Sequence, residues 1–158
     1  MTDQKHLESL RTRIDQIDDQ LLELINERVR TAVEIGADKA SRGEAVYRPE
    51  REAEIFGRLL ERNEGPVSGE GVRTIFTEIV SCARSAEEPI RVAALGPRGT
   101  FSEQAAYKVF GRQITLVEAG SIKEVFRLTE VGDAQFGVVP VENSSEGGVN
   151  ATLDLLVD

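Results

Sequence analysis

The sequence contains no apolar run of about 18 residues, the length that a membrane-spanning helix needs. Its N-terminus, MTDQKHLESL, lacks both the basic start and the apolar stretch of a secretion signal. We therefore expect a cytoplasmic protein with no membrane partner.

Cysteine and positive charge are scarce as well. Cys82 is the only cysteine, so the chain can form neither an intrachain disulfide nor a multi-cysteine metal site, and we expect no metal and no cofactor. The 19 Lys and Arg residues face 28 Asp and Glu residues, which gives a formal net charge of −9. Because nucleic-acid binding depends on clustered cations, we expect no nucleic-acid partner, and any anionic ligand must be held by a local group of cations.

Hydrophobic periodicity divides the chain into two regions. Residues 3–87 follow the period of a helix throughout, whereas short β-rich runs alternate with helical runs beyond Pro89. We therefore predict an all-α domain over residues 1–88 and an α/β domain over residues 89–158.

The first helix is predicted to run from about residue 3 to residue 41. Apolar residues recur along it at spacings of three and four: Leu7, Leu10, Ile14, Ile17, Leu21 and Leu24. At about 1.5 Å per residue this helix is roughly 57 Å long, which is more than two short following helices can cover. We therefore expect a homodimer, because dimerisation would bury the remainder.

Two shorter helices are expected to follow. The second begins at Pro49, which suits a first helical turn, and ends near Asn63. The third carries an apolar stripe after the glycine-rich break GPVSGEG. Polar residues converge on the expected bundle interior from these two helices: Arg48, Arg51, Glu52 and Glu87.

Two cations continue the apolar seam of the first helix. Arg28 and Lys39 differ by only about 20° around the helix axis and lie about 16 Å apart along it. A buried charge is costly unless it is paired or binds something, so these cations indicate an anionic ligand, with snorkelling or internal ion pairs as the alternative. Arg11 points about 100° away from Arg28, so it cannot serve the same groove in its own subunit but can reach across a dimer interface.

Three motifs, LRTRID, ERVRTAVEIGADK and YRPERE, resemble the helical class of chorismate mutases over residues 6–88. The resemblance implies a three-helix domain, an intertwined dimer and the conversion of chorismate to prephenate. That reaction is a unimolecular rearrangement, which needs no nucleophile, metal or general base. It does require that a flexible dianion be held in one compact conformation, a task that suits Arg and Lys side chains.

The resemblance assigns substrate contacts to eight residues: Arg11, Arg28, Lys39, Arg48, Arg51, Glu52, Ala83 and Glu87. Arg28 and Arg51 are expected to hold the two carboxylates, and Glu52 to accept the substrate hydroxyl. Lys39 is expected to donate to the breaking ether oxygen, and Arg11 to come from the other subunit. By the same resemblance, the catalytic residues are Arg28, Lys39 and Glu87.

Three of these positions depart from the family pattern. Arg48 stands where members often carry an acidic residue and Ala83 where some carry Ser, which affects peripheral contacts. Glu87 stands where others have Gln, and a carboxylate cannot donate a hydrogen bond. Glu87 must therefore be protonated to assist the ether oxygen, and activity is expected to fall as the pH rises.

Beyond Ile90 the pattern predicts the element order β-α-β-α-β, from IRVAALG to QFGVVPVE. Ser121 with Glu124, and Thr100 with Glu103, indicate capping boxes at the starts of the two helices. The segments GPRGTFSE and ENSSEGG are each able to bind an anion, although such turns are more often purely structural.

Together, GPRGTFSEQAA and GVVPVENSSEGGVNATLDLL resemble the opening of prephenate dehydratases, and the order of the two regions is that of the bifunctional enzymes of phenylalanine synthesis. The resemblance implies a lobe of the type II periplasmic-binding-protein kind. Prephenate-binding residues are then expected at Thr100, Ser102, Glu142, Asn143, Ser144 and Ser145. Because the family's catalytic Thr-Arg-Phe motif and its phenylalanine-binding domain lie beyond residue 158, we expect a partial lobe with neither dehydratase activity nor feedback inhibition.

Two other functions fit parts of the pattern. The helical region is compatible with a non-catalytic dimerisation arm attached to a ligand-binding lobe, although such an arm would carry apolar residues at positions 28 and 39. A mutase-like domain that acts on another small dianion, such as an isochorismate lyase, is the second alternative.

Overall fold

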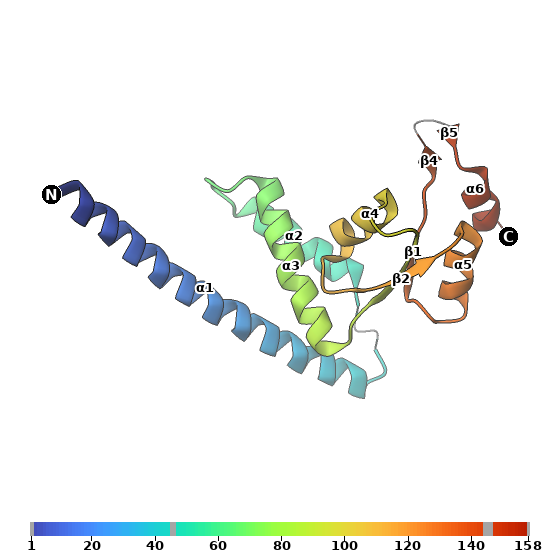
Figure 1. The fold of residues 1–158 in the computed structure, drawn as a ribbon. Coiled ribbons are helices and arrows are strands. Elements are labelled where there is room, and N and C mark those ends of the chain that lie inside the picture. Colours follow the sequence, from blue (N-terminus) through green and yellow to red (C-terminus); the bar gives the residue numbers. More distant parts are fainter. Residues whose placement is uncertain (1, 45–46, 144–146, 158) are drawn as a thin grey trace. The chain divides into compact units, whose positions relative to one another are not determined.

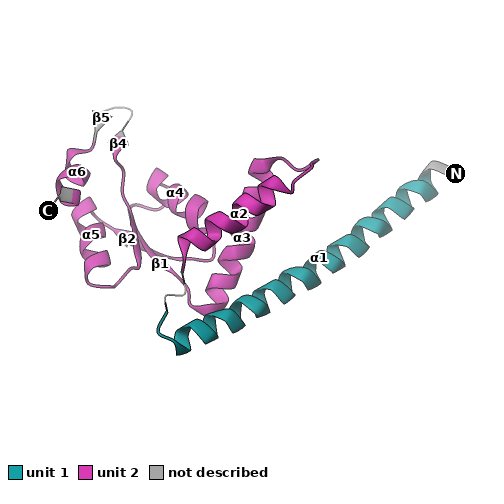
Figure 2. Ribbon diagram, turned by 180° about the vertical axis from the view of Figure 1, so that it is seen from behind, with its two compact units in different colours: residues 1–46 teal, residues 47–158 magenta. Residues whose placement is uncertain are grey.

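The computed structural model describes residues 2–44, 47–143 and 147–157 (Figure 1). The chain divides into two compact units, residues 1–46 and residues 47–158 (Figure 2). No helix within the described ranges is long and apolar enough to cross a bilayer.

The first unit consists almost entirely of helix α1 (Thr2–Ser41), which runs for 40 residues without a break. The predicted bounds of the first helix are therefore confirmed. Lys39 lies in its last turn, where a cation is favoured by the partial negative charge of the helix C-terminus, and Gly43 follows with a φ of 69°. The apolar stripe of this helix is exposed: Leu7, Leu10, Ile14, Ile17, Leu21 and Leu24 have exposed fractions between 45% and 61%.

The second unit begins with helices α2 (Pro49–Glu61) and α3 (Gly69–Glu87), which pack on each other. Pro49 opens α2, as the sequence predicts, because its missing N–H is not needed in a first turn. Ser68 caps α3 by accepting a hydrogen bond from the backbone N–H of Gly71 at 3.0 Å. The all-α character expected for the first half of the chain is therefore confirmed.

The remainder of the second unit alternates strands and helices: β1 (Arg91–Leu95), α4 (Phe101–Phe110), β2 (Thr115–Ala119), α5 (Ile122–Glu130) and β3 (Phe136–Val138). The strands form a parallel sheet in the order β2-β1-β3, with Ala93 of β1 opposite both Val117 and Gly137. The predicted β-α-β-α-β order is confirmed. Ser121 caps α5 as expected, because its hydroxyl accepts the N–H of Glu124 at 3.2 Å.

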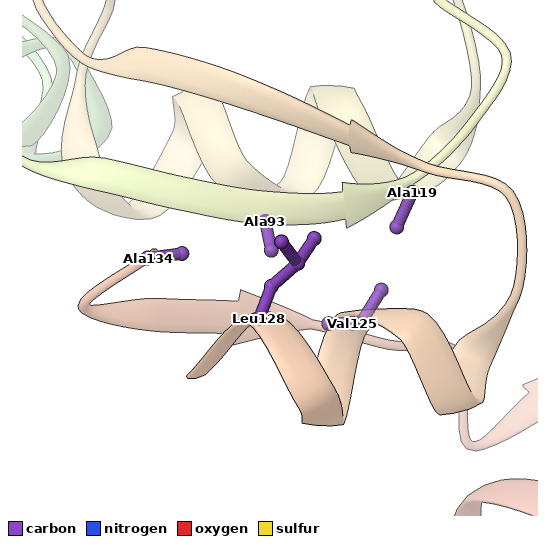
Figure 3. Packing of buried hydrophobic residues seen from close by; sticks show 5 residues of the cluster. All are labelled: Ala93, Ala119, Val125, Leu128 and Ala134. Atoms are coloured by element: carbon purple, nitrogen blue, oxygen red, sulfur yellow. The ribbon is translucent and has the colours of Figure 1, made fainter. Parts of the chain in front are cut away.

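One face of the sheet is covered by α5. Figure 3 shows Val125 and Leu128 of this helix pointing toward Ala93 of β1 and Ala119 of β2. The strand residues are small, so the helix lies close to the sheet, and a Cβ at Gly137 would come within 2.7 Å of the Val125 side chain.

The opposite face of the sheet is covered by α4. Val92, Ala106 and Phe110 are buried there, and the rings of Tyr47 and Phe136 pack against them. β1 is buried on both faces, as a central parallel strand must be. The chain just before α2 thus contributes a ring to the core of the α/β region.

Three C-terminal elements were not predicted from the sequence: β4 (Glu142–Asn143), β5 (Gly147–Gly148) and α6 (Asn150–Val157). Helix α6 packs on α5 and is anchored by Thr152, which is fully buried and donates its hydroxyl to the Pro140 carbonyl at 2.6 Å. With only eight residues, α6 is too short to show a clear helical period.

Helix α3 meets the turn after α4 through polar contacts. The backbone N–H of Arg112 donates to the Glu78 carboxylate, and that of Gln113 to the Ser81 hydroxyl, each at 3.1 Å. Gly111 precedes these two residues with a φ of 74°, and a Cβ there would come within 2.4 Å of the Ser81 Cβ. The boundary expected between residues 88 and 89 falls inside this compact unit and, as a division between functional domains, stays a prediction.

The Gly111→Ala substitution should destabilise the protein by at least about 3 kcal/mol, because it adds a steric clash with Ser81 to the strain of a positive φ. Gly132 is the matched control, since it also has a positive φ (79°) but an added Cβ would meet nothing within 4 Å. Gly132→Ala should cost only about 1–2 kcal/mol. Urea unfolding measures both values, and equal losses would show that α3 does not restrain this turn.

Candidate active site

Three of the predicted site residues lie on α1. Arg28 and Lys39 are eleven residues apart on a continuous helix, so the angular relation expected from the sequence holds, with about 20° between them. Arg11 lies nearer the N-terminus of the same helix and on a different side of it. The first unit thus presents two cations along one side of its helix.

Predicted residues of α2 cluster at its N-terminus. Arg48 is the N-cap residue, and Arg51 and Glu52 lie in the first turn, where the helix dipole stabilises a carboxylate. Arg51 points to solvent and pairs with Glu54 at 2.8 Å, both side chains being more than 60% exposed. Glu52 turns inward, with 18% of its side chain exposed. The two neighbouring residues therefore have different environments.

The predicted residues of α3 lie in its C-terminal half. Ala83 is buried, with 4% of its surface exposed, and Glu87 is the last residue of the helix. A small side chain at position 83 is in keeping with the close packing around it.

Arg84 is a polar residue of the same helix that the sequence analysis missed. It is 8% exposed, and its Nη1 lies 3.5 Å from Oε1 of Glu52. It follows the buried Val80 by four residues, so the helical period already placed it on the buried face. That spacing was the signal that could have identified it.

Tyr47 completes the surroundings of Glu52. Its ring packs edge-on against Phe136 at 5.0 Å between centroids. Burial is the main reason that the pKa of the Tyr47 phenol lies above its ordinary value, and the negative charge of Glu52 raises it further. The Arg84 guanidinium acts in the opposite direction and lowers this pKa.

The described residues among those predicted for the α/β region follow the carboxyl ends of β1 and β3. Thr100 is the N-cap of α4, where its hydroxyl accepts the Glu103 N–H at 3.5 Å and donates to the Leu95 carbonyl at 3.0 Å. The Glu103 carboxylate accepts the N–H of Gly99, so the expected capping box forms in modified form. Ser102 lies in the first turn of α4.

The remaining residues predicted for this lobe follow β3. Glu142 and Asn143 form β4, whereas Ser144 and Ser145 lie outside the described residues. Because β1 and β3 are adjacent and parallel, the segments that carry Thr100 and Glu142 leave the sheet at the same edge. The strand order β2-β1-β3 puts the switch point of the sheet between β1 and β3, and open α/β sheets bind ligands outside the carboxyl ends of the strands at such a point.

A separate open groove of about 740 Å³ lies where α2, α3 and α4 meet. Its walls include Phe56, Arg73, Glu78, Tyr107, Lys108 and Arg112. Arg73 lies over the Phe56 ring at 5.9 Å and Arg112 over the Tyr107 ring at 5.4 Å, so aromatic faces already engage two of its cations. None of the residues predicted from the sequence lines this groove. Across the described ranges, no group of three or more His, Cys, Asp or Glu side chains is placed to hold a metal ion.

Comparison with protein families gives two matches along the chain. The family described as chorismate mutase type II matches residues 10–88, and the prephenate dehydratase family matches residues 92–158. A solved structure of a chorismate mutase from Thermus thermophilus is 34% identical, with a TM-score of 0.52. That similarity covers 52% of this chain and 94% of the Thermus chain.

Curated relatives carry both activities in their names. The bifunctional chorismate mutase/prephenate dehydratases of Pseudomonas aeruginosa and Neisseria gonorrhoeae are 47% and 44% identical to this chain. The matches cover 100% and 92% of this chain, but only 45% and 40% of the relatives. The bifunctional protein of Escherichia coli is 30% identical over 99% of this chain and 45% of its own length. The chain therefore spans less than half the length of these relatives.

Replacing Glu52 by Gln should lower the pKa of Tyr47, because the Glu52 carboxylate disfavours the negatively charged phenolate. The ultraviolet absorbance of tyrosinate, followed against pH in a Tyr107→Phe background, reports Tyr47 alone because the chain has two tyrosines. Glu54→Gln is the matched control, since Glu54 lies on the same helix but pairs with Arg51 in solvent. An unchanged titration in the Glu52 variant would contradict the proximity of Glu52 to Tyr47.

Proposed function

We propose that this chain, which belongs to the chorismate mutase type II family, converts chorismate to prephenate by an intramolecular rearrangement. The observation that carries the proposal is the 34% identity to a solved chorismate mutase across 94% of that protein. The eight substrate-contacting residues expected from the sequence, Arg11 to Glu87, fall within or beside the helices of this region. The alternatives of an isochorismate lyase or a non-catalytic arm are not favoured, because the relatives are named as mutases or as bifunctional mutase/dehydratases.

The proposed mechanism relies on binding geometry. Arg28 and Arg51 hold the two carboxylates of chorismate, with Arg51 exchanging its solvent-exposed pairing with Glu54 for the ligand. The Glu52 carboxylate accepts a hydrogen bond from the ring hydroxyl of chorismate. Lys39 donates a hydrogen bond to the ether oxygen, where negative charge develops as the C–O bond breaks. The bond that breaks and the bond that forms lie in the same molecule, so no nucleophile, metal or cofactor takes part.

We further propose that the active form is a homodimer through α1. Six apolar side chains of this helix, from Leu7 to Leu24, are about half exposed in the single chain, and the long helix of a second copy offers a surface of the same period. In such a dimer Arg11 contributes to the site of the partner subunit. This assembly explains why a 40-residue helix carries an apolar stripe along its N-terminal half.

The α/β region is proposed as part of a prephenate-binding lobe over residues 89–158, after a mutase domain over residues 1–88. Support comes from the prephenate dehydratase match at residues 92–158 and from the position of Thr100 and Glu142 beside the β1/β3 switch point. In this arrangement the product of the mutase reaction is the ligand of the neighbouring lobe. The absence of dehydratase activity and of phenylalanine inhibition, and the cytoplasmic location, stay predictions.

The first test is the loss of chorismate absorbance on adding the purified chain. Arg28→Ala should lower kcat/KM by about 10²–10³-fold, because it removes a charged group that holds the substrate. Arg30→Ala is the matched control, since Arg30 lies on the same helix but about 200° around it. Absence of turnover by the unaltered chain would rule out the mutase assignment.

Mixing two inactive variants tests the dimer. Arg11→Ala and Arg28→Ala chains, unfolded together and refolded, should recover about one quarter of the unaltered activity, because half of the dimers are mixed and each mixed dimer has one intact site. Each variant refolded alone is the control. No recovery from the mixture would show that Arg11 does not serve the partner subunit.

The Glu87→Gln substitution should flatten the dependence of kcat/KM on pH. Only the protonated form of Glu87 can donate a hydrogen bond to the ether oxygen, so activity of the unaltered chain should fall as the pH rises, whereas a Gln side chain donates at every pH. Glu88→Gln, one residue further along the chain, is the control for the loss of a charge. A profile that is the same in the Glu87 variant would remove the catalytic role of this residue.

A further inference from the structure

The guanidinium of Arg84 joins three helices of the second unit. From the last turn of α3, its Nη2 donates to the carbonyl oxygen of Phe110, the last residue of α4, at 2.6 Å. Its Nη1 lies 3.5 Å from the Glu52 carboxylate of α2. The guanidinium carbon is 5.2 Å from the centre of the Tyr47 ring and 6.0 Å from that of the Phe110 ring.

A cation at this position is not explained by packing alone. Arg84 is 8% exposed, and within the described part of the chain its Nε and Nη1 have no hydrogen-bond acceptor. Well-packed apolar residues often replace buried ion pairs without loss of stability, so a stable core does not require an arginine here. An arginine that is buried with incomplete hydrogen bonding therefore indicates a function that needs its charge and its planar shape.

The positive charge of Arg84 acts on the carboxylate of Glu52. Its carboxylate is the acceptor for the substrate hydroxyl in the proposed mutase mechanism, and a misplacement of about 1 Å in such a group can lower the rate about 100-fold. Arg84 supplies a cation that holds a carboxylate oxygen from one direction. A carboxylate offers hydrogen-bond acceptors only, which suits a bond donated by the substrate hydroxyl.

Arg84 is itself held by the α/β region. The Phe110 carbonyl is at the C-terminus of α4, where the helix dipole is negative and attracts a guanidinium. The turn that follows is fixed to α3 by the Arg112–Glu78 and Gln113–Ser81 bonds. The support of the Arg84 side chain thus lies outside the three helices that carry the mutase residues.

We propose that Arg84 is a positioning residue for the mutase reaction, which orients the Glu52 carboxylate and takes its own orientation from the end of α4. The proposal rests on the proposed mutase function and adds a residue that does not itself contact the substrate. Through the hydrogen bond from Arg84 to the Phe110 carbonyl, the α/β region also affects the orientation of a side chain in the helical region.

The test is a double-mutant cycle on kcat/KM in the full chain, with Arg84→Met and Glu52→Gln. Arg84→Met should lower kcat/KM about 10–100-fold, and the double variant should be no worse than Glu52→Gln alone, because both changes remove the same interaction. Arg84→Lys should recover part of the loss, since it keeps the charge but not the planar fork. Arg73→Met is the matched control: it removes an exposed arginine of the same helix and should leave kcat/KM unchanged.

A second measurement separates positioning from a general loss of structure. The pKa of Tyr47 should rise in Arg84→Met, because the guanidinium lowers it, whereas partial unfolding would move it down toward the ordinary tyrosine value. Where Arg84→Met does not fold, Arg84→Lys takes its place in the cycle.

Failure of the positioning role and failure of the proposed mutase function give different results. Losses that add in the double variant, or an Arg84→Met chain as active as Arg73→Met, would overturn the positioning role while leaving an active mutase. An inactive unaltered chain would instead overturn the proposed function, and this inference with it.

Discussion

A charged side chain can be buried in this protein only where another charge, a carbonyl dipole or an aromatic face replaces the water that it loses. Arg84 uses all three, in the Glu52 carboxylate, the Phe110 carbonyl and the Tyr47 ring. These partners come from distant parts of the chain, so the contacts of one incompletely hydrogen-bonded guanidinium join the start of α2 to the ends of α3 and α4. This contact and the polar bonds beside it join two mutase-family helices to the α/β region within the second unit.

The α/β region obeys a different constraint, which is the close approach of helix and sheet. Alanine residues of β1 and β2 and Gly137 of β3 leave room for Val125 and Leu128 of α5. With β1 buried on both faces, polar groups gather at the ends of the strands. The proposed ligand site of this region is the edge at which β1 and β3 end, close to Thr100 and Glu142.

Helix α1 carries an apolar stripe that stays exposed in the single chain. Its apolar stripe has the regular spacing of a helix–helix seam, yet the residues from Leu7 to Leu24 remain about half exposed. In the proposed homodimer, a second copy would cover this stripe and bring Arg11 to the site of the partner subunit. The proposed reaction fits such an arrangement, because a rearrangement within one dianion needs several fixed cations and no reactive group.

Local spacing in the sequence was sufficient to predict α1, α2, α3, the three parallel strands and the Ser121 cap, because each depends on residues a few positions apart. The short elements after β3 were missed, since α6 has too few residues to show a period and is held by the Thr152–Pro140 bond. The substrate-contacting residues came from resemblance to a family, and their roles stay predictions. Only the tertiary structure decided the strand order and the pairing of Glu52 with Arg84, because a buried charge is satisfied by whichever partner the folded chain brings to it, and that partner has no fixed distance in the sequence.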